Sequence, residues 1–242
     1  VDPPAVLTNA GLRSTLSPMA RRALTAVLLL AFVSAASAAG PGRDGPFLLL
    51  SGQFLDFSRD LNRNLTLWHF EKAFYVPRLE RGGAWSVSYG RKSYNGSWDV
   101  SFLRLRRTVA LENGSRAATY EALDLNGRSF FLKKLPLRPY FLGGITLPFL
   151  RVKGGSFYRG KTLNASYVGA GLQAGAGLHL DLGPSVFLNA DVSYRWIGFL
   201  YAFGEGKGRD INDLRTEPMG PEFGRLLRTD VLTLTLGVGF IL

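Results

Sequence analysis

Five residues in one short stretch of the chain have side chains that could do chemistry together. They are His179, Asp181, Asp191, Ser193 and Arg195. A serine, a histidine and an aspartate held at the right geometry form the triad of many hydrolases. The sequence alternates around all five, so they share one face of two neighbouring strands. On that face an ion pair with polar neighbours is the simpler interpretation, and the elements that carry the residues decide between the two.

The two strands alternate strictly between apolar residues and polar or small ones. Every second residue from Val168 to Leu182 is apolar, and the alternation resumes from Val186 to Trp196 after the break at Gly183-Pro184. Successive side chains of a strand point to opposite faces, so this stretch is a long hairpin with one apolar face. Strands in soluble proteins run to about 5–6 residues. The length and strictness of the pattern therefore predict a transmembrane β-barrel.

Similar alternation elsewhere predicts an all-β, antiparallel, up-and-down barrel of eight strands. Asn126-Gly127 could be a hairpin turn within residues 119–135, or a bulge, and we take 119–135 as one strand. We expect loops at 58–82, 153–164 and 202–228, and a slip of the alternation near Leu103. Long and short connections then alternate, as in outer-membrane barrels. The expected strands are 47–57, 84–91, from 97 onward, 119–135, 140–152, 167–182, 186–196 and 229–242.

In a narrow barrel the polar face points into the lumen. The predicted lumen network is Gln173, His179, Asp181, Asn189, Asp191, Ser193 and Arg195. We expect no catalytic residue in it. With two histidines, no cysteine and no spaced cluster of ligands, we also expect no metal site and no cofactor.

The N-terminal part has the order of an export signal. A basic stretch ending in Arg21-Arg22 precedes an apolar run to Val33 and an Ala36-Ser37-Ala38 cleavage motif, which is the pattern of a secretory signal peptide. We expect export through the Sec pathway. The expected division is a patternless extension at 1–18, the signal peptide at 19–38, a leader at 39–46 and the barrel at 47–242.

The formal net charge of +11 calls for an anionic partner. Nucleic acid is a common partner of basic chains, but the export signal makes it an unsuitable one here. Outer-membrane lipid and lipopolysaccharide fit better. Arg104, Arg106 and Arg107 at the outer end of the third strand are the predicted contacts with lipid phosphate.

Aromatic residues near the expected strand ends indicate a lipid–water boundary, where the ring stays apolar and the polar tip stays wet. They are Trp85, Tyr89, Trp98, Tyr140, Phe149, Tyr194, Trp196 and Tyr201.

The last hundred residues resemble the small eight-stranded outer-membrane barrels of the OmpA-like and OmpW-like group. The resemblance rests on residues 167–171, the 180–185 turn, residues 189–196 and the last strand. It implies the barrel fold and an outer-membrane location. It also implies contact with the barrel-assembly machinery through the C-terminal strand, although the aromatic Phe240 lies two positions before the end, where members of the group commonly end in an aromatic residue.

Three functions follow as hypotheses. The first is a monomeric, non-enzymatic outer-membrane barrel of a Gram-negative bacterium with an envelope or surface-interaction role. The second is a narrow channel or transporter for a small apolar or anionic solute, in the OmpW-like manner. The third is a lipid-A-modifying enzyme, which the inward position of the polar residues disfavours.

Overall fold

The structure is a computed structural model that describes residues 43–69, 72–111, 114–132, 135–204, 207–211 and 227–242. The expected extension and signal peptide at 1–38 lie outside the described residues. The eight long strands are β1 (Gly45–Phe57), β4 (Gly82–Ser93), β5 (Gly96–Leu111), β6 (Gly114–Phe130), β7 (Leu137–Tyr158), β8 (Lys161–Asp181), β9 (Val186–Gly204) and β11 (Leu227–Ile241).

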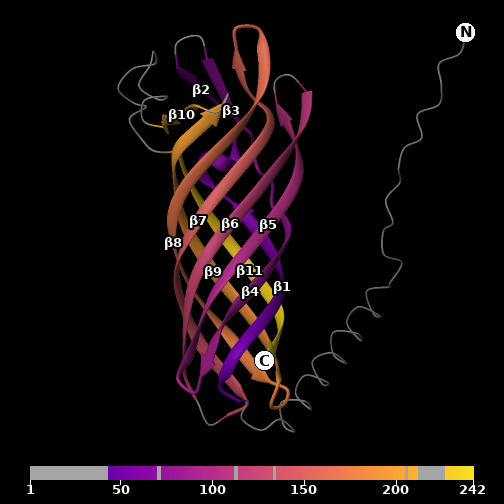
Figure 1. The fold of residues 1–242 in the computed structure, drawn as a ribbon, viewed down its shortest axis with the longest axis vertical. Coiled ribbons are helices and arrows are strands. Elements are labelled where there is room, and N and C mark those ends of the chain that lie inside the picture. Colours follow the sequence, from indigo (N-terminus) through magenta and orange to yellow (C-terminus); the bar gives the residue numbers. More distant parts are fainter. Residues whose placement is uncertain (1–42, 70–71, 112–113, 133–134, 205–206, 212–226) are drawn as a thin grey trace, which may run out of the picture. The chain divides into compact units, whose positions relative to one another are not determined.

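These eight strands form a closed barrel (Figure 1). Each pairs antiparallel with both neighbours in the order β1-β4-β5-β6-β7-β8-β9-β11, and β11 pairs back with β1. Closure removes the sheet edges, which would otherwise carry unpaired backbone groups. The prediction of an eight-stranded antiparallel barrel is confirmed. Residues 114–130 form a single strand, in which Asn126 and Gly127 pair with Asp99 and Trp98 rather than making a turn.

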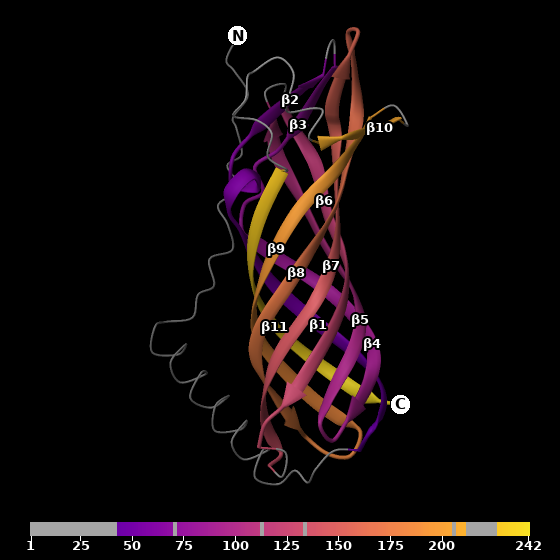
Figure 2. The ribbon, with the colours of Figure 1, turned by 90° about the vertical axis from the view of Figure 1, so that its left-hand side faces the viewer.

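The two ends of the barrel have different connections. At one end, which we call the short-turn end, lie residues 94–95, 131–132, 135–136 and 182–185 together with the start of β1 and the end of β11. The opposite end, the long-loop end, holds the described residues 58–69, 72–81 and 207–211 (Figure 2). The predicted loop at 153–164 is wrong. Strands β7 and β8 continue as a hairpin whose turn is Arg159-Gly160, with both residues at positive φ.

The other two predicted loops also contain regular structure. Within 58–82 lie a 3-10 helix, η1 (Arg59–Asn62), and two short strands, β2 (Leu65–His69) and β3 (Lys72–Val76). β2 pairs with β3, and β3 pairs with the outer end of β7. Within 202–228, β9 runs to Gly204 and pairs with β10 (Lys207–Asp210).

The outer wall of the barrel is apolar on every strand. Leu125, Ile145 and Leu172 are direct cross-strand partners, and each has 47% or more of its surface exposed. Leu180 departs from the outward row of β8 and is buried opposite Leu137. One exposed apolar residue from each strand, in barrel order, is Leu50, Val87, Val100, Leu125, Ile145, Leu172, Val192 and Leu236. Among the described residues, no helix is both long enough and apolar enough to cross a membrane.

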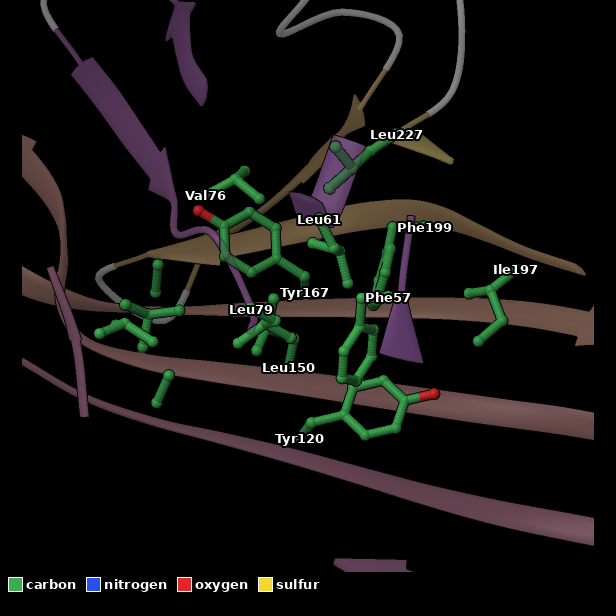
Figure 3. Packing of buried hydrophobic residues seen from close by; sticks show 14 of the residues in the cluster. Phe57, Leu61, Val76, Leu79, Tyr120, Leu150, Tyr167, Ile197, Phe199 and Leu227 are labelled. Atoms are coloured by element: carbon green, nitrogen blue, oxygen red, sulfur yellow. The ribbon is translucent and has the colours of Figure 1, made fainter. Parts of the chain in front are cut away.

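The interior is apolar toward the long-loop end and polar below it. Inward residues such as Phe57, Tyr120 and Tyr167 pack against Leu61 and Leu79 from the 58–81 connection (Figure 3). Rings of Phe57 and Tyr120 meet edge to face with centroids 5.3 Å apart. The connection therefore fills the mouth of the barrel with apolar side chains.

This apolar interior corrects the expected slip near Leu103. Leu103 and Leu105 point inward in phase with Asp99 and Ser101, and the register with β6 is continuous. The alternation of direction is intact, and only the chemistry of the inward face changes from polar to apolar.

Candidate functional site

The middle of the lumen is organised around Arg195 on β9. Its Nη2 lies 3.1 Å from Oδ2 of Asp124 on β6 and 3.5 Å from Oε1 of Gln53 on β1. Gln53 in turn donates to Ser86 Oγ on β4 at 2.8 Å. Four strands from different sides of the barrel are thus joined by one chain of polar contacts.

A second set of contacts centres on Asp99 of β5. Arg128 on β6 forms an ion pair with Asp99, and Asn126 Nδ2 donates to Asp99 Oδ1 at 3.1 Å and to Ser101 Oγ at 3.3 Å. Gln173 on β8 donates to Asn126 Oδ1. Buried polar groups cost free energy unless they are paired. These contacts supply partners for the Asp99 carboxylate and for both amide atoms of Asn126, whereas Arg128 Nε and Gln173 Oε1 have no hydrogen-bond partner among the described residues.

The short-turn end is closed by a charged cluster between aromatic rings. Asp181 pairs with both Lys92 and Arg138, and all three side chains are 2% or less exposed. His179 lies beside them, with Nε2 3.0 Å from Asp181 Oδ1 and Nδ1 2.7 Å from Asn189 Oδ1. Phe130 and Phe187 flank the His179 ring at centroid distances of 5.0 and 4.7 Å, and Lys92 and Arg138 lie over the same two rings.

All seven residues of the predicted lumen network are buried and point inward, but they do not form one group. His179, Asp181 and Asn189 share the short-turn cluster. Asp191 accepts a hydrogen bond of 2.9 Å from Tyr140 Oη instead. Gln173 and Arg195 bond to the centres described above. The burial values place Gln173, His179, Asp181, Asn189, Asp191, Ser193 and Arg195 at 8% exposed or less.

Most of the partners lie on earlier strands and were missed. Tyr140 is one of them: it was expected at the lipid boundary, but it is 1% exposed inside the lumen, so that expectation is wrong. The alternation on β4 to β7 could have identified the others, because their polar residues alternate along the strand with apolar residues that face outward. The missed partners are Lys92, Asp99, Asp124, Asn126, Arg128, Arg138 and Tyr140.

The geometry around His179 is that of a structural contact. Both ring nitrogens already face oxygen atoms of Asn189 and Asp181, and within the described part of the chain Ser193 makes no hydrogen bond to the histidine. A triad needs the serine hydroxyl on one ring nitrogen. Across the same residues, no group of three or more His, Cys, Asp or Glu is placed to hold a metal ion.

Little space is left in the polar lumen. The cavity between Gln53, Asp124, Asn126, Asp191 and Arg195 has a volume of about 20 Å³, room for about one water molecule. Small residues make room for neighbouring side chains: a Cβ on Gly177 would lie 2.6 Å from Cζ of Tyr140, its cross-strand partner on β7. Side chains from all sides therefore fill the interior. The chain is a closed eight-stranded β-barrel with a packed lumen.

The three arginines predicted to contact lipid phosphate separate in the structure. Arg104 pairs with Glu121 on β6 at 3.4 Å, and Arg151 on β7 reaches the same carboxylate at 3.4 Å. Arg106 and Arg107 instead line a hollow of about 820 Å³ at the long-loop end, together with Arg78 and Arg81. We call this the arginine hollow. Arg78 and Arg81 were missed, because they stand in the segment that was expected to be an irregular loop.

Comparison with known proteins gives distant structural likenesses. No family model matches the chain, and no curated protein sequence matches it. Neisserial surface protein A is 14% identical with a TM-score of 0.49, and the match covers 82% of this chain and 97% of that one. The attachment invasion locus protein Ail of Yersinia pestis, in complex with the heparin analogue sucrose octasulfate, is 12% identical with a TM-score of 0.47, covering 82% and 98%.

The N-terminal β-barrel domain of Pseudomonas aeruginosa OprF is 13% identical with a TM-score of 0.39, and the match covers 82% of this chain and 98% of that domain. The closed circuit of strand pairings in this chain, rather than any of these scores, establishes its fold.

Proposed function

We propose that this protein is a monomeric, integral outer-membrane β-barrel of a Gram-negative bacterium, with a non-enzymatic role in the envelope or in surface interactions. The observation that carries the proposal is that the usual distribution of side chains is reversed. Apolar side chains are exposed on all eight strands, while charged pairs are buried inside the barrel. A closed barrel is the form of sheet that hydrocarbon accepts, because every backbone group is paired within it. A strand needs about 9–11 residues to span the bilayer, and the shortest wall strand, β4, has 12.

The charges on the outer wall support a boundary between membrane hydrocarbon and lipid headgroups near Arg104. Phe102 is the last large apolar residue on the outward face of β5, and Arg104, Glu121 and Arg151 follow it toward the long-loop end. Ions at the edge of an apolar wall suit the transition from hydrocarbon to headgroups. The long-loop end then faces outward, and the short-turn end faces the periplasm, as in barrels of this kind.

The packed lumen supports an anchoring or interaction role over transport. A solute path would have to pass the apolar mouth, the Arg195–Asp124 pair and the Lys92–Asp181–Arg138 cluster, each of which joins different walls. Eight strands enclose just enough room for side chains or one small ligand. The proposal also includes insertion by the barrel-assembly machinery through β11, the strand that closes the barrel onto β1.

The decisive test is the behaviour of residues 39–242 with and without an amphiphile. We expect refolded protein in detergent to migrate differently on a denaturing gel before and after boiling, and to show a β-type far-ultraviolet spectrum. A monodisperse, folded chain in plain buffer would contradict membrane insertion. In planar bilayers we expect no steady conductance steps above background, whereas regular steps would favour transport. Lipid A exposed to the protein should be unchanged by mass spectrometry.

A further inference from the structure

The arginine hollow combines a large concave surface with an excess of positive charge. Among the described residues, its lining contains Arg78, Arg81, Arg106 and Arg107 against a single carboxylate, Glu80. Within the described residues, no carboxylate forms an ion pair with any of the four guanidinium groups. Four like charges around one hollow repel one another, and a bound anion would relieve that repulsion.

The hollow is held in shape from both sides. On one side, Leu79 is buried in the apolar mouth and its backbone N–H donates to Leu61 O at 2.7 Å, while the N–H of Arg78 donates to Asn64 Oδ1 at 2.8 Å. Because Leu79 points inward, its neighbours Arg78 and Glu80 are turned to the outside.

On the other side, Arg106 and Arg107 belong to the continuous ladder of β5 with β6. The guanidinium of Arg107 occupies the space that a Cβ on Gly82 would fill. Arg107 follows the inward phase of β5, opposite to Arg106, and the glycine at the start of β4 lets it lie against the backbone at the rim of the hollow.

The position of the hollow indicates what binds in it. Arg106 is two residues beyond Arg104 on the outward face of β5, a rise of about 7 Å along the strand. Arg104 marks the end of the apolar wall, so the hollow begins about one residue pair beyond that wall. In a barrel inserted in a membrane, this is the level of the lipid headgroups.

We propose that the arginine hollow binds the phosphate groups of a phosphorylated glycolipid in the outer leaflet. This inference rests on the proposed membrane location and adds a partner and a binding site to it. Guanidinium groups bind phosphate through paired, charge-assisted hydrogen bonds. The volume of about 820 Å³ suits a sugar headgroup with more than one phosphate. The acyl chains would lie along the apolar wall near Trp85 and Phe102, whose rings are in edge-to-face contact.

The test compares paired substitutions that remove the same charge. Arg106→Gln with Arg107→Gln, and separately Arg78→Gln with Arg81→Gln, change the hollow. Arg43→Gln with Arg91→Gln removes two exposed arginines at the short-turn end and serves as the control. Each refolded protein is titrated in detergent micelles, at about 0.15 M salt, with bisphosphorylated lipid A, with the same lipid after removal of its phosphates, and with pyrophosphate.

We expect each hollow pair to weaken binding of bisphosphorylated lipid A at least tenfold, or about 1.4 kcal/mol, and the control pair to change it less than about twofold, since the lost contacts are charge-assisted hydrogen bonds. Dephosphorylated lipid and free pyrophosphate should each bind the wild type at least about tenfold more weakly than lipid A. Equal binding of the two lipids, or an equal effect of the control pair, would overturn the proposal. Pyrophosphate that binds as tightly as lipid A would assign the site to a free anion instead.

The barrel itself is checked in the same samples by migration with and without boiling. If all proteins migrate as folded barrels but the wild type binds lipid A equally well with and without its phosphates, the proposed binding site is wrong and the proposed membrane location is unaffected. A wild type that forms no barrel in any amphiphile would remove both.

Discussion

Arg195 on β9 and Asp124 on β6 form an ion pair across the lumen, with Nη2 and Oδ2 3.1 Å apart. Two strands, β7 and β8, separate β6 from β9 along the wall, so the pair connects parts of the barrel that share no ladder hydrogen bonds. The side chains are 3% and 1% exposed. Such a pair fixes how the walls face one another, and breaking it would leave one buried charge without its partner.

We predict that Asp124→Ala lowers the free energy of unfolding by about 3–5 kcal/mol, because Arg195 then keeps a buried, uncompensated charge. The double variant Asp124→Leu with Arg195→Met should be clearly more stable than Asp124→Ala, since replacing both charges by apolar groups of similar size is often neutral. Urea unfolding in lipid vesicles, followed by gel migration, measures both. A double variant as unstable as the single one would show that the pair itself, rather than the stranded charge, supports the barrel.

Gly177 is a position where the lumen has no room for a methyl group. An added Cβ would lie 2.6 Å from Tyr140 Cζ and 2.7 Å from Asp191 Cβ, two residues that hydrogen-bond to each other. We predict that Gly177→Ala destabilises the barrel by about 1–3 kcal/mol, the usual range for overpacking. Gly143→Ala is the matched control, because a Cβ at Gly143 meets nothing within 4 Å. Comparable losses for both in urea unfolding would contradict a packed lumen at Gly177.

The sequence was sufficient to predict the strands of the barrel wherever inward and outward residues differ in polarity. On β8, β9 and β11 polar or small residues face inward and apolar ones outward, so the alternation gives strand, face and length together. The count of eight strands depended on reading 119–135 as one strand, and β6 is one strand because Asn126 and Gly127 stay in the ladder with β5.

The sequence was insufficient where the lumen is apolar. On β1 the inward row runs from Phe47 through Ser51 and Gln53 to Phe57, so this row is apolar at its two ends and polar in the middle, and the strand pattern looks mixed. Leu103 also faces an apolar part of the lumen, and for that reason the sequence suggested a slip of the alternation there.

The candidate sites were harder to predict, because their partners come from distant positions. Asp124 is 71 residues from Arg195, and Lys92 is 89 residues from Asp181. Spacing within one strand cannot show such pairs. Likewise, Arg104 and Arg106 lie on the same face of β5, and the sequence does not show that Arg104 forms an ion pair with Glu121 on the next strand while Arg106 lines the hollow.

The apolar mouth should depend on Leu61, which is fully buried among residues of the wall and of the 58–81 connection. We predict that Leu61→Asp releases this connection, because an unpaired carboxylate there would be buried in an apolar cluster. The barrel should persist, since its closing ladders do not include η1. Protease added to reconstituted vesicles should then cut within 58–81 far faster than in the wild type, while the gel shift on boiling is kept. Trp68→Asp, at a position 40% exposed on β2, is the control and should leave cleavage nearly unchanged.

The short-turn end should also be sensitive to loss of one negative charge. Among the described residues, Asp181 is the one carboxylate that pairs with both Lys92 and Arg138, so Asp181→Asn would leave two buried cations facing each other. We predict a loss of about 3–5 kcal/mol in the free energy of unfolding. Adding Lys92→Met should recover part of it, because one of the two stranded cations is then gone while its packing against Phe187 is kept. Urea unfolding in vesicles of wild type, single and double variants measures the coupling. The outcome that would contradict this account is a double variant less stable than Asp181→Asn, because Lys92 would then contribute through contacts other than its pair with Asp181.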